Sequence, residues 1–322
     1  MFKNILFILA ILILSTIIFS CGDDDEPTGP GVTDPTALTW SAIADIPTPR
    51  SFPMVEVVKD KFYVFGGEGA RSKVDIYDPA TNSWTSGLDM PEGIEFGGSS
   101  AVVDSKIYIL GGFKKDFVPS TSIWRYDPVE NIWTQLPDMP SFRWAMASAH
   151  YNGKIYLFGG FNFAANLVKA LERYDINQQS WTTLEPMPYI NALGSGVAYG
   201  DRIYSMGGFN RMALAISTTA FYDIDDNTWS ITTEMPTARG SAAVVNFHGN
   251  IVNIGGLSFG TDTLALSIVE SFDPSDNTWT TLSSLPSGRA KHGVAVIGEK
   301  IYVIGGVSIK GPISQCLVGE LL

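Results

Sequence analysis

The sequence has few of the residues on which several classes of protein depend. Among 322 residues there are only two cysteines, Cys21 and Cys316, and three histidines. A disulfide framework needs more cysteines, so we expect side-chain packing to hold the fold together. Lys and Arg number 21 against 33 Asp and Glu, which leaves a net charge of −12. Because phosphate binding needs a basic surface, we expect no nucleic-acid partner.

The first twenty residues differ in kind from the rest. Lys3 precedes an apolar run from Ile5 to Phe19, which ends in Ser20 and Cys21. This pattern predicts a signal peptide over residues 1–20. Residues 18–21 resemble the lipobox of bacterial lipoproteins, which implies that Cys21 is acylated and becomes the mature N-terminus. The alternative is an uncleaved membrane anchor, for which the run is short.

Residues 21–37 contain an acidic run, Asp23 to Glu26, followed by Pro, Gly and Thr. Such a composition cannot form a core, so we predict a solvated tether. An acidic run behind a lipid-bearing cysteine resembles the surface-export signal of some Gram-negative lipoproteins. We therefore expect an exported protein on the outer membrane, which touches the membrane only through its lipid. A plain spacer on a periplasm-facing lipoprotein is the alternative.

A pair of adjacent glycines returns six times in the remaining chain. Each pair closes a short apolar run rich in β-branched and aromatic residues, which is typical of a buried strand. The intervals of 45, 48, 48, 48 and 50 residues indicate an array of β units. The doublets are Gly66-Gly67, Gly111-Gly112, Gly159-Gly160, Gly207-Gly208, Gly255-Gly256 and Gly305-Gly306.

Each unit contains further signals in a fixed order. A strand of small residues and a tight turn, such as Lys59-Asp60 or Asn152-Gly153, come before the doublet. A third strand follows the doublet and ends in an aromatic residue and Asp. Seven residues after that aromatic comes a tryptophan that opens a fourth strand: Trp84, Trp133, Trp181, Trp229 and Trp279. We expect these tryptophans and aromatic-Asp pairs to serve packing between units and turn formation.

Four antiparallel strands repeated radially form a β-propeller, which is an all-β fold. The glycine doublet, the aromatic-Asp pair and the spaced tryptophan together resemble kelch repeats over residues 38–322. The sixth unit has its doublet but no tryptophan after it, whereas Trp40 stands near the start without a unit of its own. We therefore predict six blades, with the N-terminal strand completing the last blade and closing the ring. We expect a monomer.

One face of such a propeller carries the loops between second and third strands. From the second glycine to the third-strand aromatic these loops span 10, 14, 14, 14 and 16 residues, and their sequences scarcely agree. Variable loops on a rigid scaffold are common binding sites. We therefore expect a glycan or protein ligand on this variable loop face.

One residue stands 16 positions before each of the six doublets. We predict that these six residues form a ring at the mouth of the central channel. Arginines there would bind a carboxylate or sulfate, and Trp144 beside them would stack on a sugar ring. The structural alternative is that the arginines bond to backbone carbonyls, or to Glu56 and Glu95. The six positions are Arg50, Glu95, Arg143, Asn191, Arg239 and Arg289.

Two enzymatic resemblances bear on the function. Galactose oxidase is built on kelch repeats, but its copper site needs histidine and tyrosine ligands, and the three histidines here are scattered. We therefore expect no metal and no cofactor. The chain also resembles bacterial N-acetylneuraminate epimerases, which are exported six-bladed kelch propellers. Glu95 between Arg50 and Arg143 would supply their acid-base chemistry. We favour a non-catalytic binding propeller over this mutarotase alternative.

Overall fold

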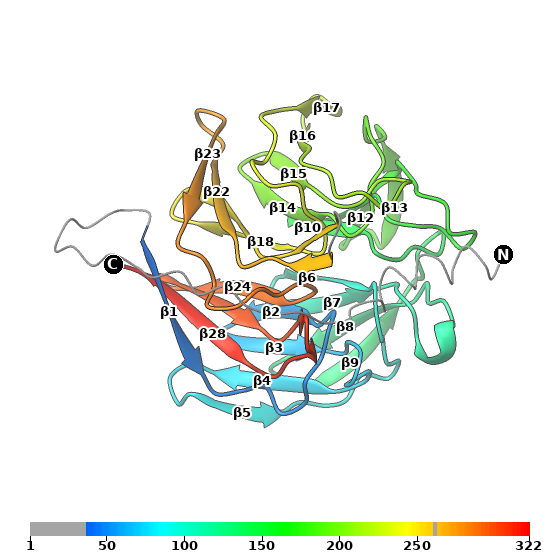
Figure 1. Ribbon diagram of the computed structural model, residues 1–322. Helices are drawn as coiled ribbons and strands as arrows, with labels where there is room; N and C mark the ends of the chain where they lie inside the picture. Colours follow the sequence, from blue (N-terminus) through cyan, green and yellow to red (C-terminus); the bar gives the residue numbers. More distant parts are fainter. Residues whose placement is uncertain (1–36, 260–262) are drawn as a thin grey trace.

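The computed structural model describes residues 37–259 and 263–322. The predicted signal peptide and residues 21–36 of the predicted tether, with Cys21, lie outside the described residues. The described chain forms six four-stranded antiparallel sheets arranged around a central channel (Figure 1). The predicted six-bladed β-propeller is therefore confirmed. None of the helical structure in this part of the chain is long and apolar enough to cross a membrane.

The blades follow one another along the chain, and in blades 1–5 the strands run in order from the channel outward. Blade 1 contains β2 (Met54–Val58), β3 (Lys61–Phe65), β4 (Val74–Asp78) and β5 (Ser83–Ser86). Blade 2 contains β6 (Ser99–Val103), β7 (Lys106–Leu110), β8 (Ile123–Asp127) and β9 (Ile132–Leu136). Blade 3 contains β10 (Ala147–Tyr151), β11 (Lys154–Phe158), β12 (Leu171–Asp175) and β13 (Ser180–Leu184).

Blade 4 contains β14 (Ser195–Tyr199), β15 (Arg202–Met206), β16 (Thr219–Asp223) and β17 (Thr228–Ile231). Blade 5 contains β18 (Ala243–Phe247), β19 (Asn250–Ile254), β22 (Val269–Asp273) and β23 (Thr278–Leu282). Blade 6 contains β24 (Gly293–Ile297), β25 (Lys300–Ile304), β28 (Cys316–Leu321) and β1 (Leu38–Ile43).

Local sequence explains the hairpins and the glycine doublets. At the β2–β3 turn, Lys59 and Asp60 both have positive φ, 51° and 57°, which matches the twist of a two-residue hairpin. Gly66 and Gly67 have φ of 55° and 90°. A Cβ on Gly67 would lie 2.6 Å from the carbonyl oxygen of Ser51, so only glycine fits where the chain leaves the second strand.

The ring closes as predicted. Strand β1 pairs with β28 along its whole length, and Trp40 lies opposite Gly319. A Cβ on Gly319 would lie 2.6 Å from the Trp40 ring, so the glycine leaves room for the indole. The two described chain ends therefore share one blade, and neither the first nor the last blade is left incomplete.

The core is divided among the blade boundaries. Six clusters of buried side chains each join two neighbouring blades; in one of them Phe65 of blade 1 packs with Ile107 and Tyr126 of blade 2. In blade 1, Tyr77 faces Trp84 across β4 and β5, and the indole nitrogen of Trp84 donates to the carbonyl oxygen of Ala44 at 2.8 Å. The spaced tryptophan thus ties its own blade to the preceding connection.

Candidate functional site

Three consecutive loops on the variable face share one architecture. The β7–β8 loop includes the short helix η1 (Lys115–Phe117), and the β11–β12 and β15–β16 loops have similar lengths. Each begins with a phenylalanine directly after its glycine doublet and closes with a short β-bridge. The bridges are Phe113 with Pro119, Phe161 with Leu167, and Phe209 with Ala215.

Asparagine side chains brace two of these loops. The Oδ1 atom of Asn162 accepts hydrogen bonds from the backbone N–H groups of Ala164 and Asn166 at 3.0 and 3.1 Å. Asn210 does the same for Met212 and Leu214 at 2.9 and 3.2 Å. Asn favours such local bonds in turns, and here they fix the loop backbone.

Aromatic rings support the loops from below. Trp144 stacks on Phe161 with ring centroids 4.8 Å apart, and Phe113 lies 4.9 Å from Phe142 and 5.3 Å from Phe96. Trp144 is only 2% exposed. The ring that was predicted to stack on a sugar therefore lies beneath the loops and supports them.

The tips of the three loops expose large apolar side chains. We call these residues the loop-tip patch: Phe117 (44% exposed), Val118 (47%), Phe163 (54%), Met212 (73%) and Leu214 (48%). Lys115, Asp116 and Arg211 are exposed on the same loops. Large exposed apolar groups that are grouped on adjacent braced loops mark interaction sites.

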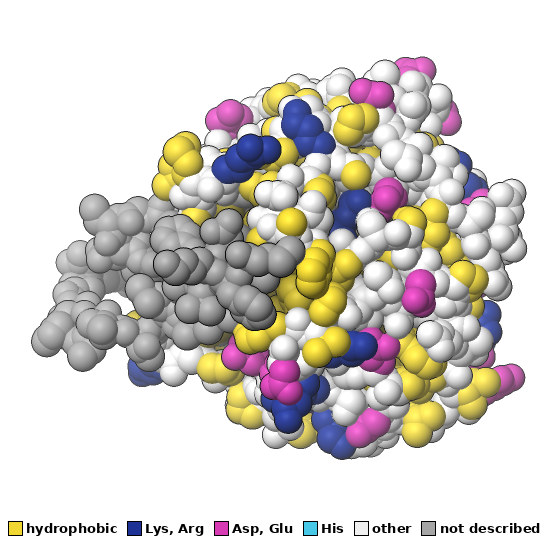
Figure 2. Space-filling model, turned by 90° about the vertical axis from the view of Figure 1, so that its right-hand side faces the viewer, with side chains coloured by type: hydrophobic (Ala, Val, Ile, Leu, Met, Phe, Trp, Pro, Cys, Tyr) yellow, Lys and Arg dark blue, Asp and Glu magenta, His cyan; other side chains and the backbone are white. Residues whose placement is uncertain are grey.

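Figure 2 shows one side of the molecule, on which hydrophobic side chains lie among Lys, Arg, Asp and Glu side chains of both signs. Neither sign dominates this side, although the chain carries a net charge of −12.

The predicted arginine ring lies inside the protein. The arginines and Asn191 are almost completely buried: Arg50 (0%), Arg143 (3%), Asn191 (2%), Arg239 (1%) and Arg289 (0%). Burial lowers the pKa of each arginine, and that of Arg289 to about 10. Their guanidinium groups point into their own blades, so they present no row of free charges at the channel mouth.

Each buried arginine has partners on the third strand of its blade or just before that strand. Arg50 pairs with Asp75 of β4, Arg143 with Glu172 of β12 at 2.7 Å, and Arg239 with Glu270 of β22 at 2.6 Å. Arg289 donates to the side-chain oxygen of Gln315 at 2.7 Å, and Asn191 donates to the carbonyl oxygen of Gly207 at 2.7 Å. The arginines therefore have the structural role that was given as the alternative, although their partners are not the expected Glu56 and Glu95.

The backbone at these positions also joins neighbouring blades. The carbonyl oxygen of Arg50 accepts from Gly306 at 2.9 Å, and that of Arg239 accepts from Gly208 at 2.8 Å. An arginine thus binds the preceding blade through its backbone and its own blade through its side chain. A sequence signal for this role exists: Asp75, Glu172 and Glu270 each stand two residues before the third-strand aromatic, whereas Ala220 stands there in blade 4, which has Asn191.

Glu95 occupies a different environment from the arginines. The N–H group of Gly67 donates to the carbonyl oxygen of Ile94, just as that of Gly306 donates to Arg50. Ile94 therefore occupies in blade 2 the position of the arginines, and Glu95 comes one residue later. This extra residue accounts for the longer proline-to-doublet spacing. Glu95 pairs with Arg71 at 3.1 Å and is partly exposed. The structure does not bring Glu95 together with the guanidinium groups of Arg50 and Arg143.

Six residues form the channel mouth on the loop face. Each stands two positions after a residue of the predicted ring. The six residues there all have positive φ, and five of their N–H groups donate to the carbonyl of the equivalent residue in a neighbouring blade, at 2.7–3.0 Å. Burial lowers the pKa of Lys291 to about 8, and its ammonium group lies 4.9 Å from the Phe52 ring centroid. The six residues are Phe52, Gly97, Ala145, Leu193, Ser241 and Lys291. No sequence pattern predicted this set of six residues, because their contacts are made by the backbone.

Comparison with known proteins agrees with this architecture. Six four-stranded blades with glycine doublets and spaced tryptophans define a kelch-type β-propeller, a class typical of protein-interaction domains. The model of the Attractin/LZTR1 beta-propeller matches residues 107–316, more than half of the chain, and a kelch motif matches residues 49–91. The chain belongs to the Attractin/LZTR1 beta-propeller family.

Similar sequences cover only part of this chain. Beta-scruin of Limulus polyphemus is 32% identical over 34% of this chain and 13% of its own length. Kelch-like protein terF of Aspergillus terreus is 34% identical over 33% of this chain and 26% of its own. The chain thus spans about a quarter or less of these relatives. The solved structure of YjhT matches 85% of this chain and 95% of its own at 18% identity, with a TM-score of 0.77, and shows the same fold.

Proposed function

We propose that this propeller binds a protein partner through the loop-tip patch of blades 2–4. The carrying observation is the exposure of Phe117, Phe163 and Met212 at the ends of adjacent loops, where they are 44%, 54% and 73% exposed. Apolar anchors that enter pockets of a partner supply most of the affinity of protein interfaces.

The construction of the loops favours such binding. Asn162 and Asn210 brace two of them; packed aromatic rings lie beneath the first two loops, and Phe209 packs in an apolar cluster beneath the third. A loop that is already ordered loses little conformational entropy on binding, so more of the contact energy becomes affinity. The exposed charges beside the apolar tips are Lys115, Arg211 and Asp116, so the cations outnumber the acid, and we infer a partner whose apolar segment is bordered by acidic residues.

A glycan is the second ligand class that the variable face was expected to serve. Sugar rings stack on accessible aromatic faces, and Phe117 and Phe163 are the aromatic members of the patch. The aliphatic members Val118, Met212 and Leu214 fit a protein surface better, so we place the protein partner first.

A photo-crosslinking amino acid at position 163 tests this proposal, with the same group at position 129 as the matched control. Val129 is 64% exposed on the turn between β8 and β9, which lies on the opposite face. We expect a discrete protein adduct from position 163 and none from 129. A purified partner identified in this way should then bind the isolated protein. Equal crosslinking from both positions would contradict the proposal.

We also propose that the chain is exported and held on the outer membrane by acylation of Cys21. The apolar run from Ile5 to Phe19 and the resemblance of residues 18–21 to a lipobox support this. A clickable fatty-acid analogue should label the protein, and Cys21→Ser should abolish the label and release the protein from membranes. Labelling that persists in Cys21→Ser would overturn acylation at this site.

A further inference from the structure

The central channel holds a cavity of about 550 Å³ at the end opposite the loop-tip patch. The first strand of every blade contributes to its wall, and much of the wall is valine. The valines are Val55, Val57, Val102, Val197, Val244, Val245, Val294 and Val296. A cavity of this size accepts a small organic molecule.

One blade differs from the other five in this wall. Glu56 stands on β2 ten residues before the glycine doublet, and the equivalent residues of the other blades are small and apolar: Ala101, Ala149, Val197, Val245 and Ala295. Packing alone is satisfied by Ala or Val at this place. Among the described residues that line the cavity, Glu56 is also the only acidic one.

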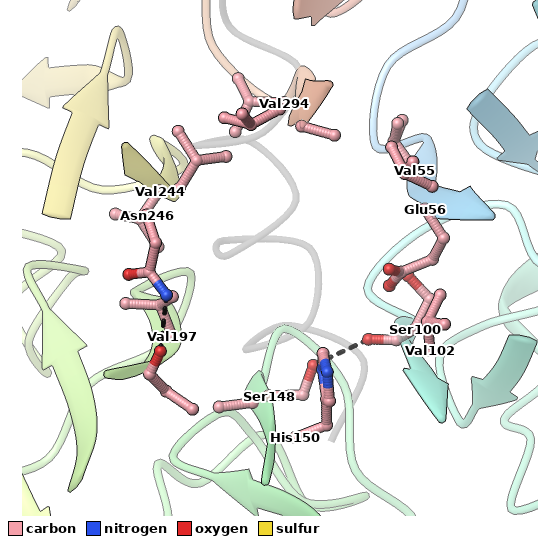
Figure 3. Close-up of a pocket in the computed structure, with 17 residues that line it drawn as sticks. Val55, Glu56, Ser100, Val102, Ser148, His150, Val197, Val244, Asn246 and Val294 are labelled. Carbon is pink, nitrogen blue, oxygen red and sulfur yellow. Dashed lines mark hydrogen bonds between the residues drawn. The ribbon is translucent and has the colours of Figure 1, made fainter. Parts of the chain in front are cut away.

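Polar groups gather beside this carboxylate. Figure 3 shows the Glu56 carboxylate directed toward Ser100, with Ser148 and His150 on the next blade and valines across the cavity. Ser100 lies beside the Glu56 carboxylate, and the hydroxyl of Ser148 donates to the carbonyl oxygen of Ser100 at 3.2 Å. No Lys or Arg lines the cavity within the described chain, so the carboxylate has no counter-ion there.

Burial disfavours the charge on Glu56 and raises its pKa to about 7. The other ionisable group in the cavity wall is His150. Burial lowers the pKa of His150, so it stays neutral near pH 7 and does not compensate the carboxylate.

We propose that the channel cavity binds a small aliphatic ammonium ion, with the Glu56 carboxylate as its counter-ion and the valine wall around its aliphatic part. The ammonium group supplies the positive charge that the cavity wall lacks, and charge-assisted hydrogen bonds to a carboxylate are strong. A metal ion needs more ligands, and the described residues contain no cluster of three His, Cys, Asp or Glu side chains.

The turns at this end of the channel favour entry of a cation. The turns that follow the innermost strands carry Asp60, Asp104, Asp201 and Glu299, against one lysine, Lys59. The cations that begin the next strands, such as Lys61 and Lys106, pair with third-strand carboxylates, here Asp78 and Asp127. A rim with this excess of carboxylates attracts cations over a distance.

Titration of the full-length protein with n-butylammonium at pH 8, followed by calorimetry, tests the proposal, with n-butanol as the uncharged control ligand. We expect butylammonium to bind at least about tenfold more tightly than butanol, because a charged hydrogen bond is added. Glu56→Gln should weaken butylammonium binding by about tenfold or more and leave butanol unchanged. The matched variant Glu130→Gln removes one exposed carboxylate from a turn between β8 and β9 and should have no effect.

A second readout does not depend on any variant. Because burial raises the pKa of Glu56 to about 7, part of this carboxyl is protonated at pH 7, so binding of a cation should release protons, measured by titration in buffers of different ionisation enthalpy. Affinity should rise as pH rises through 7 and then level off. Absence of butylammonium binding, equal affinity for butanol, or binding that neither releases protons nor responds to Glu56→Gln would overturn the proposal. Partner binding at the loop-tip patch is independent of all these outcomes.

Discussion

The Nη2 atom of Arg239 lies 2.6 Å from the Oε2 atom of Glu270 inside blade 5, and the two side chains are 0% and 2% exposed. Removal of one partner leaves the other charge buried and unpaired. We expect Arg239→Met to lower the free energy of unfolding by about 3–5 kcal/mol, and Arg239→Met with Glu270→Leu to recover much of the loss. Urea denaturation measures both.

The exposed pair of Arg71 and Glu95 is the control for this prediction. Because Arg71 is 49% exposed, solvent screens the pair, and Arg71→Ala should change the free energy of unfolding by no more than about 1 kcal/mol. Similar losses for Arg239→Met and Arg71→Ala would show that burial does not decide the strength of the arginine pairs.

Stability should fall in acid partly because of His292. Burial and the nearby charge of Arg289 lower the pKa of His292 to about 3, whereas the unfolded chain titrates near pH 6.5. Between these values the unfolded state binds more protons, so stability declines as pH falls from about 6.5 toward 3. His292→Gln should flatten this part of the profile, as measured by urea denaturation at several pH values.

His248 serves as the matched control, because its side chain is 44% exposed beside Glu299. His248→Gln should leave the acid limb of the stability profile nearly unchanged. If His248→Gln flattened the profile as much as His292→Gln, the buried imidazole would not be its cause.

Glu95 was the candidate acid-base residue of a mutarotase. Since Arg50 and Arg143 pair with Asp75 and Glu172 inside their blades, they are not available to hold a substrate carboxylate beside Glu95. We expect freshly dissolved N-acetylneuraminate to reach anomeric equilibrium at the same rate with and without the protein, as followed by proton NMR. Faster equilibration that is lost in Glu95→Gln would establish the enzymatic alternative.

The loop-tip patch should matter for binding and not for folding. Phe163→Ser and Met212→Ser remove exposed side chains, so each should change the free energy of unfolding by no more than about 0.5 kcal/mol. Each should weaken binding of the crosslinked partner by about fivefold or more, equivalent to about 1 kcal/mol. Surface plasmon resonance with that partner measures the change.

Val129→Ser and Ile132→Ser are the controls for the patch, since they remove exposed apolar side chains at the β8–β9 turn, on the opposite face of blade 2. These two variants should bind the partner like the unmodified protein. A partner affinity that drops equally in all four variants would mean that the loop face has no special role.

Much of the fold could be read from spacing. The glycine doublets mark the end of the second strand of each blade. The interval between Tyr77 and Trp84 predicts a cross-strand pair. Both signals depend on local backbone geometry and on the two-residue period of a strand. The lone Trp40 predicted ring closure for the same reason: a fourth strand needs a third strand to pair with. The loop face was likewise predicted from loop length, although not which side chains are exposed at its tips.

The direction of the arginine side chains could not be predicted in this way. Arg50 and Asp75 are 25 residues apart, and a residue at the start of an innermost strand can face either the channel or its own blade. The sequence alone determined the blade count, the order of strands and the closure of the ring, since these follow from periodic local signals. Only the tertiary structure decided which charges are paired in the interior and that Glu56 stands in the channel without a counter-ion among the described residues, because pairing depends on contacts between strands distant in the chain.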